Sequence, residues 1–380
     1  MKTITLSFLL VGVVLGQDLK EYHKSNLEFT SDIYTKYSSQ QDGNFLVCPL
    51  SAHTILSLAA IGAKEQTAKE LTSALRIPSD VVQIENMFKE VSSYLDVDKD
   101  YQLSSANKIY VREDIQLKND FKAIAQNTFK SEVQNINFKN KKAATNEINK
   151  WVELKTKDKI KNLLSESSIK PNTAALLINA VFFKGKWISK FGEPYSSKFY
   201  VSKTETVDVN MMVQRNSFPY YFDKDLNTEY MEFPFVGDDV VMTIALPKEK
   251  DGLSNLEKSI STVISEKPYK IMDSIVTIPK FTMESKINFK SILESLGVIV
   301  PFTNSANFSG ISDVTIAIDE VVQKTFIEVN EFGVTAAGAT EISFMIVSMP
   351  EVDFTANRPF IYYLKHKVHG IFFIGRYTKP

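Results

Sequence analysis

Residues 331–350 read EFGVTAAGATEISFMIVSMP, and this stretch separates two runs that have the composition of strands. The run before it is 325–329 and the run after it is 359–364, and both are rich in β-branched and aromatic residues. A connection of this length is unusual inside a compact domain unless it serves a function. The segment is therefore predicted to be a functional loop.

The side chains of this segment alternate in character. At every second residue, one face consists of Val334, Ala336, Gly338, Thr340, Ile342 and Phe344, and the other of Thr335, Ala337, Ala339, Glu341, Ser343 and Met345. The first face can be buried as the face of a strand. The glycines and alanines, however, weaken any helix or strand that stands alone. The pattern favours a chain that is a loop in one state and a strand in another, and spacing alone leaves a flexible hairpin connection as the alternative.

The N-terminus has the pattern of a secretory signal peptide. Lys2 precedes an apolar run over residues 4–15, and Val14 and Gly16 stand at the expected cleavage positions. This run is too short to span a bilayer, and no later run approaches the required length of about 20 residues. We therefore expect residues 1–16 to be removed and residues 17–380 to form a soluble, secreted, extracellular protein with no membrane partner.

Composition restricts the partners and the source of stability. Cys48 is the single cysteine, so a hydrophobic core must hold the fold together without disulfide bonds. A formal net charge of −1 provides no field that attracts nucleic acid or an anionic membrane. Lysines crowd residues 139–161, but Glu147, Glu153 and Asp158 are interleaved with them, as on an ordinary solvated helix, and polyanion binding is the alternative.

The chain changes from helical to strand-like character along its length. Residues 52–61 are apolar nearly all round, which indicates a buried helix, and residues 67–71 continue it as an amphipathic stretch. Ile148, Trp151 and Val152 mark the buried face of another helix. Strand-like runs dominate the second half, at residues 240–246, 274–278, 314–318, 325–329, 359–364 and 371–374. No repeat or linker divides the chain, so we predict one α+β domain.

No arrangement of residues indicates an enzyme or a metal centre. The four histidines, His23, His53, His366 and His369, lack the spacing of a metal site, so structural or solvated roles are predicted for them. The sequence contains no nucleophile elbow and no phosphate-binding glycine loop. Cys48 adjoins an apolar run, where a buried and inert thiol is expected. We predict no cofactor, no metal and no catalytic residue.

Short motifs along the chain resemble those of one family, the serpins. The resemblance runs from about Asn26 to Pro380 and is carried by residues 44–51 (NFLVCPLS), 179–187 (NAVFFKGKW), 279–281 (PKF), 296–298 (LGV), 308–311 (FSGI), 354–360 (FTANRPF) and 372–376 (FFIGR). It implies a secreted, inhibitory serpin of the invertebrate, insect-like type. The implied fold packs helices on three β-sheets and exposes a reactive-centre loop at about residues 331–353.

The resemblance also implies a mechanism. A protease attacks the exposed loop and forms its covalent acyl-enzyme, after which the hinge of the loop inserts into the central sheet and traps the protease in a one-to-one complex. The residues that correspond to the hinge are Glu331, Gly333, Val334, Thr335, Ala336, Ala337, Gly338 and Ala339. Ser51, Asn179 and Gln323 map to the region where the sheet opens.

The usual spacing from hinge to cleaved bond in the family implies a reactive bond between Val347 and Ser348. Val347 suits the small apolar pocket of an elastase-like protease. Phe344 or Met345 is the alternative bait for a chymotrypsin-like pocket, and Ile346 with Val347 suits a cathepsin-like cysteine protease. The predicted loop contains no lysine or arginine, so a trypsin-like protease would find no cation for its anionic pocket.

Some positions depart from the family pattern. Phe332 stands where an acidic residue is common, Val334 where threonine is frequent, Cys48 where serine is usual, and Gln323 where many members have histidine. Val334 is uncharged and β-branched and should still insert. A non-inhibitory serpin that serves as a carrier, storage protein or chaperone is the competing function, because an uncharged hinge face can be buried there too.

The sequence indicates no partner other than a protease. Residues 84–100 are acidic and poor in lysine, so we expect no glycosaminoglycan-binding helix there. Asn307 begins the single glycosylation sequon, which overlaps the motif at residues 308–311. A monomer without bound nucleic acid is expected.

Overall fold

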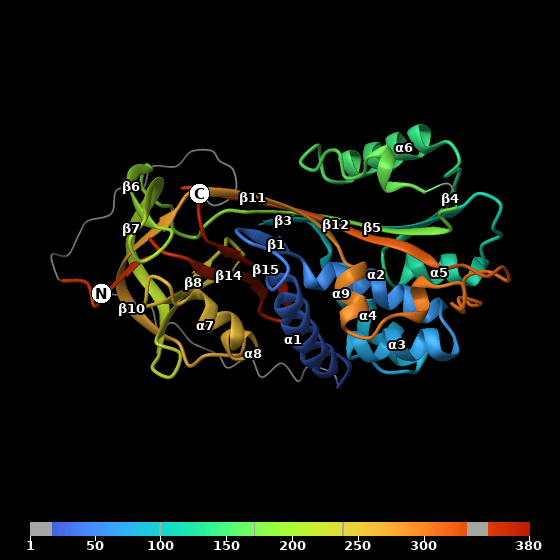
Figure 1. Cartoon of the computed structure of the whole chain (residues 1–380). Coiled ribbons are helices and arrows are strands. Elements are labelled where there is room, and N and C mark those ends of the chain that lie inside the picture. Colours follow the sequence, from blue (N-terminus) through green and yellow to red (C-terminus); the bar gives the residue numbers. More distant parts are fainter. Residues whose placement is uncertain (1–16, 99–100, 171, 238, 333–348) are drawn as a thin grey trace.

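The computed structural model describes residues 17–98, 101–170, 172–237, 239–332 and 349–380. These residues form helices packed on extended sheets, which confirms the predicted α+β class (Figure 1). The predicted signal peptide, the hinge residues from Gly333 to Ala339, and the bait and bond residues Phe344, Met345, Ile346, Val347 and Ser348 lie outside the described residues.

The first sheet contains six strands in the described part of the chain. Its order is β11-β12-β5-β3-β2, and β4 pairs with β3. The bounds are β2 Asp96–Asp98, β3 Tyr101–Arg112, β4 Glu132–Ile136, β5 Ala175–Gly185, β11 Phe281–Asn288 and β12 Ile318–Val329. The central neighbours β5 and β12 run parallel, with Asn179 opposite Gln323, whereas β3 and β11 pair antiparallel with them. A parallel pair therefore lies in the middle of the sheet.

The second sheet contains nine strands among the described residues. Its order is β1-β15-β14-β9-β8-β7-β10-β13, and β6 pairs with β7. The bounds are β1 Phe45–Val47, β6 Tyr195–Tyr200, β7 Thr206–Asp223, β8 Thr228–Pro234, β9 Val240–Pro247, β10 Lys270–Pro279, β13 Val352–Thr355, β14 Phe360–His366 and β15 Gly370–Tyr377. β7 pairs with β8 only over Tyr220–Asp223, while the rest of β7 pairs with β6 and β10. The nine strands are thus two smaller sheets that share β7, which agrees with the three sheets expected.

The helices of the described residues differ widely in length. Their bounds are α1 Gln17–Ser38, α2 Pro49–Gly62, α3 Glu65–Leu75, α4 Val81–Val91, α5 Asn119–Asn127, α6 Lys141–Lys155, α7 Leu253–Lys258, α8 Ile260–Val263 and α9 Lys290–Ser295, with 3-10 turns at η1 Ser92–Tyr94, η2 Glu166–Ser168 and η3 Val300–Phe302. Every residue of α2 is buried, as its apolar composition predicts. None of the helices described is long and apolar enough to cross a membrane.

The expected continuation of α2 through residues 67–71 is wrong, because α3 is a separate helix. α2 ends at Gly62, where the side chain of Ile311 packs so closely that a Cβ would collide with it. The carbonyl of Gly62 accepts a hydrogen bond from Gly310 N at 3.0 Å, which takes an acceptor at the end of the helix. The chain then extends through Ala63 and restarts as a helix at Glu65.

The predicted strand at 314–318 is also wrong except for its last residue. β12 begins only at Ile318, which pairs with Ala175, the first residue of β5. Val314 lies before this pairing starts, is 48% exposed, and donates its backbone N–H to Ser312 Oγ at 3.1 Å. A β-branched composition does not make a strand where no neighbouring strand is available. The other predicted strands fall within β9, β10, β12, β14 and β15, apart from one end residue.

Helices cover both faces of the six-stranded sheet (Figure 1). α2 packs on the inner face and belongs to the main core, together with Leu177 and Val181 of β5. α6 lies on the outer face and forms a second core with Ile178 and Phe182 of the same strand. The alternation of β5 side chains between the two cores is what a strand buried on both faces requires.

Candidate functional site

The seam between β5 and β12 is the feature to which the predicted loop leads. β12 ends at Val329 and continues through Asn330, Glu331 and Phe332, so the predicted hinge sequence follows directly from this strand. Parallel pairs are slightly less stable per residue than antiparallel pairs. A strand that folded back from residue 333 between β5 and β12 would be antiparallel to both of them. The seam is therefore closed in this structure but has the polarity needed to accept such a strand.

Gln323 joins β12 to the start of α2 beneath the seam. Its amide Oε1 accepts a hydrogen bond from Cys48 N at 2.8 Å, and its Nε2 donates to Cys48 O at 2.9 Å. The same Nε2 donates to Asn179 Oδ1 at 2.5 Å across the seam. Both side chains are buried, so these hydrogen bonds are shielded from water. Many serpins are expected to have histidine at position 323. Here the glutamine amide forms two hydrogen bonds with the backbone of Cys48.

The network continues from Asn179 to the next strand and to α2. Asn179 Nδ2 donates to Ser51 Oγ and to Asn107 Oδ1. Ser51 Oγ lies 2.5 Å from Ser105 Oγ and donates to Asn107 Oδ1 at 3.2 Å. The structure thus brings together the predicted residues Ser51, Asn179 and Gln323, and it adds Asn107 and Ser105 of β3. Asn107 pairs with Asn179, and Asn179 pairs with Gln323, so amides follow one another across three strands.

A second group of contacts holds the base of the hinge. Trp187 Nε1 donates to Asn330 O at 2.9 Å, and Trp187 N donates to Phe332 O at 3.3 Å. Phe191 N donates to Glu331 O at 2.9 Å, and the Glu331 carboxylate forms an ion pair with Lys280 at 2.9 Å. Burial raises the pKa of Glu331, but a backbone hydrogen bond and Lys280 outweigh it and hold this pKa below its usual value. The origin of the predicted hinge is therefore held by groups from the segment that follows β5 and from the β10–β11 turn.

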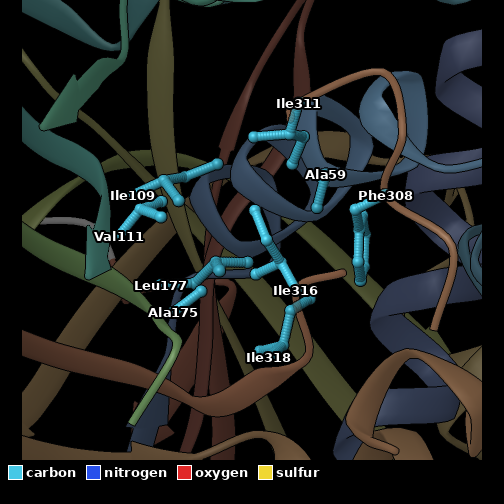
Figure 2. A pocket seen from close by; sticks show the side chains of 9 residues that line it. All are labelled: Ala59, Ile109, Val111, Ala175, Leu177, Phe308, Ile311, Ile316 and Ile318. Carbon is cyan, nitrogen blue, oxygen red and sulfur yellow. The ribbon is translucent and has the colours of Figure 1, made fainter. Parts of the chain in front are cut away.

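A small apolar cavity lies beneath the other end of the seam (Figure 2). Its lining is formed by Ala59, Ile109, Val111, Ala175, Leu177, Phe308, Ile311, Ile316 and Ile318. The cavity measures about 10 Å³ and its lining side chains carry no polar atom, so it is unsuited to a water or a polar ligand. Packing is thus incomplete where β5 and β12 begin, and lost dispersion contacts raise the free energy of this closed state.

Cys48 and the histidines have structural surroundings, as predicted. Cys48 is buried, and burial raises the pKa of its thiol to about 12, so it is an inert thiol at neutral pH. His53 is buried on α2 with Nε2 2.9 Å from Leu75 O. The rings of His366 and His369 lie with their centres 4.4 Å apart and their planes tilted by 37°, where the β14–β15 hairpin turns. Within the described ranges no group of histidine, cysteine, aspartate or glutamate side chains has the geometry of a metal site.

These histidines predict that acid destabilises the intact protein. Burial lowers the pKa of His53 and of His366 to about 4 and that of His369 to about 3, from 6.5 in each case. The unfolded chain binds these protons below about pH 6.5 and the folded chain does not. The free energy of unfolding is therefore greatest above pH 6.5 and falls as the pH drops toward 4, by ~3 kcal/mol for His53 alone.

Urea unfolding of the intact protein at pH 7.5 and pH 5.0 measures this dependence. His53→Gln keeps a donor for Leu75 O and removes one titrating group, so it should reduce the slope by about one proton. Equal urea midpoints at the two pH values would contradict the assignment of neutral buried histidines.

Comparison with known proteins finds similarity along most of the chain. The serpin family model, described as serine protease inhibitor, matches residues 24–380. The chain belongs to the serpin family. It is 35% identical to antichymotrypsin-2 of Bombyx mori over 354 residues, which cover 90% of this chain and 93% of the relative. It is 33% identical to antitrypsin of the same insect, with 96% and 95% of the two chains covered.

A solved structure shows the same fold. Serpin48 of the insect Tenebrio molitor superposes on this serpin with a TM-score of 0.89 at 35% identity, and the match covers 95% of this chain and 98% of the other. These comparisons confirm the predicted family, its insect-like character and the serpin fold. The prediction of a protease inhibitor rather than an enzyme is confirmed at the level of the family.

The predicted glycosylation sequon lies in a structured turn of this serpin. Asn307 Nδ2 donates to Glu65 Oε2 at 3.1 Å, and Asn307 Oδ1 accepts from Ser309 N at 3.1 Å. The amide nitrogen to which a glycan would be attached is thus engaged in the folded chain, which agrees with the expectation that the sequon overlaps a packed motif.

Proposed function

We propose that this serpin is a secreted suicide inhibitor that traps its target protease covalently and inserts its cleaved loop between β5 and β12. The observation that carries the proposal is the parallel seam, because the hinge sequence follows directly from one of its two strands. Insertion would replace one parallel pairing by two antiparallel pairings and would bury the Val334 face. The cleaved form would therefore be more stable than the intact form.

The buried polar network also supports this proposal, because it shows how the seam is held closed in the intact protein. Beneath the seam, the buried amides of Asn107, Asn179 and Gln323 join the strands by specific hydrogen bonds, in addition to the apolar packing on both faces of the sheet. Such bonds hold one arrangement but can be exchanged for others, because each amide has further donors and acceptors. A seam closed in this way can be held shut in the intact protein and still open when the loop is cut.

The proposal includes export and a single monomeric unit. The N-terminal pattern of Lys2 followed by the apolar run 4–15 supports removal of residues 1–16. The mature domain would then extend over residues 17–380. N-terminal sequencing of the protein from the medium of expressing eukaryotic cells tests the cleavage, with Gln17 as the expected first residue.

Incubation of the mature protein with a panel of proteases should produce a covalent one-to-one adduct. An elastase-like or a chymotrypsin-like serine protease is expected to give an adduct that survives boiling in detergent. The panel also includes a cathepsin-like cysteine protease. Trypsin should give no rapid inhibition, because the loop offers no lysine or arginine to its anionic pocket. The mass of the released C-terminal fragment identifies the bond, and a fragment that begins at Ser348 is expected.

The names of the relatives do not decide the target. One is called an antichymotrypsin and another an antitrypsin at nearly the same identity, so specificity is expected to reside in the loop rather than in the shared fold. Rapid inhibition of trypsin would refute the assigned bait. Cleavage of the loop by every protease without an adduct would refute inhibition and favour the competing function as carrier, storage protein or chaperone.

A further inference from the structure

A layer of chain covers the outer face of the seam. It consists of α6 and the segment that returns toward β5, residues 141–169, which we call the α6 strap (Figure 1). Ile148 and Val152 of α6 and Ile160 of the return segment share one apolar core with Phe182 of β5 and Val322 of β12. The α6 strap therefore packs on both strands that border the seam.

Glu132 of β4 ties the helix of the α6 strap to one side of the sheet. Its carboxylate lies 2.9 Å from Lys108 Nζ of β3 and 2.9 Å from Lys155 Nζ of α6, and it accepts a hydrogen bond from Trp151 Nε1 at 3.1 Å. The Lys108 side chain is only 5% exposed, and its ammonium lies 4.9 Å from the Trp151 ring centre. One carboxylate thus joins two strands and a helix through charge-assisted contacts.

The return segment is tied to the other side of the seam. Lys324 Nζ of β12 donates to Lys161 O at 2.6 Å and forms an ion pair with Glu284 of β11 at 2.7 Å. Asn149 closes the α6 strap on itself, because its side chain donates to Leu164 O and accepts from Leu164 N, both at 2.9 Å. The α6 strap is consequently fastened to β3 and β4 on one side of the seam and to β12 on the other, and the Asn149 contacts hold it together between these ties.

Neighbouring strands lie about 4.8 Å apart, so a strand inserted between β5 and β12 widens the seam by that distance. The α6 strap cannot keep both ties at their present lengths while this happens. We propose that Glu132 is a positioning residue for loop insertion, which seats α6 over the seam through Trp151 and Lys155 and so limits the rate at which β5 and β12 separate. This inference rests on the proposed function, because it concerns the step in which the loop enters.

The test must loosen α6 without leaving a buried charge unpaired. Removing Glu132 itself would leave the buried Lys108 ammonium without its carboxylate partner and would lower the stability of the whole fold. The double variant Trp151→Phe/Lys155→Met instead cuts both links from Glu132 to α6 and leaves the Lys108 pair intact. Lys150→Met, at an exposed lysine of the same helix, is the matched control.

The rate of strand acceptance can be measured without any protease. A synthetic peptide with the sequence of residues 333–344 is incubated with each intact protein, and annealing is followed on native gels. We expect the double variant to anneal the peptide about tenfold faster than the wild type, equivalent to ~1.4 kcal/mol of barrier, and Lys150→Met to match the wild type. The stoichiometry of inhibition of the double variant should move toward one inhibitor per protease.

An annealing rate within twofold of the wild type, even with a lower urea midpoint, would show that the Glu132 contacts serve stability alone and would overturn the inference. Slower annealing would overturn it as well. If the wild type forms no covalent adduct while the double variant still anneals the peptide faster, the proposed function fails and the role of Glu132 stands.

Discussion

Replacement of Val334 by arginine is expected to convert this serpin from an inhibitor into a substrate of the same protease. Val334 is the first β-branched residue of the hinge and begins the face that alternates with Ala336 and Gly338. In the proposed mechanism this face enters the seam and is buried. A guanidinium without a partner charge would be buried with it, at a cost of several kcal/mol.

The effect of this barrier on inhibition depends on the relative rates of loop insertion and of acyl-enzyme hydrolysis. A barrier increase of about 3 kcal/mol slows insertion roughly 100-fold, which is enough to let hydrolysis win. The variant should be cut at the same bond as the wild type, release active protease and leave no adduct on a denaturing gel. Cleavage should also raise the thermal stability of the variant less than that of the wild type.

Thr335→Arg is the matched control, because it places the same charge on the opposite face of the alternation. It should retain more of the adduct than Val334→Arg. Unchanged stoichiometry of inhibition in Val334→Arg would show that Val334 does not enter the sheet, and the hinge assignment would then be wrong.

Several strands were predicted from sequence because they carry local patterns. Runs of β-branched residues located β9, β14 and the second half of β12, whereas the two-state segment after residue 331 stays a prediction. Ser51, Asn179 and Gln323 were assigned by resemblance, and the structure brings all three into one network. Position in a family motif was sufficient here because the fold is the same.

Other parts of the site could not be predicted, because they depend on neighbours far apart in sequence. Asn107 is a polar residue in a strand, and only pairing with Asn179 gives it a partner. The pairing of Glu132 with Lys108 follows only from the alignment of β4 beside β3. The end of α2 at Gly62 likewise depends on the close approach of Ile311, which the local sequence around Gly62 does not indicate.

Replacement of Gln323 by methionine is expected to shorten the lifetime of the intact protein more than any other single change beneath the seam. Methionine preserves the length of the side chain but leaves Cys48 N, Cys48 O and Asn179 Oδ1 without this partner. An unsatisfied buried polar group costs about 1–3 kcal/mol, so a loss of ~3 kcal/mol or more is expected. The urea midpoint of the intact protein should fall, and inhibitory activity should decay faster during incubation.

Thr325→Val provides the graded comparison for this change. Thr325 lies two residues along the same strand, is buried on the same face, and donates to Leu46 O at 2.9 Å. Its loss should cost about 1 kcal/mol, because one donor rather than a bridge between β12, β5 and α2 is removed. The freshly prepared Gln323→Met protein should still form the adduct, since the hinge is unaltered and the seam opens more readily. A urea midpoint for Gln323→Met no lower than that of Thr325→Val would mean that the amide bridge does not hold the seam closed, and the resistance to opening would then have to come from the α6 strap on the other face.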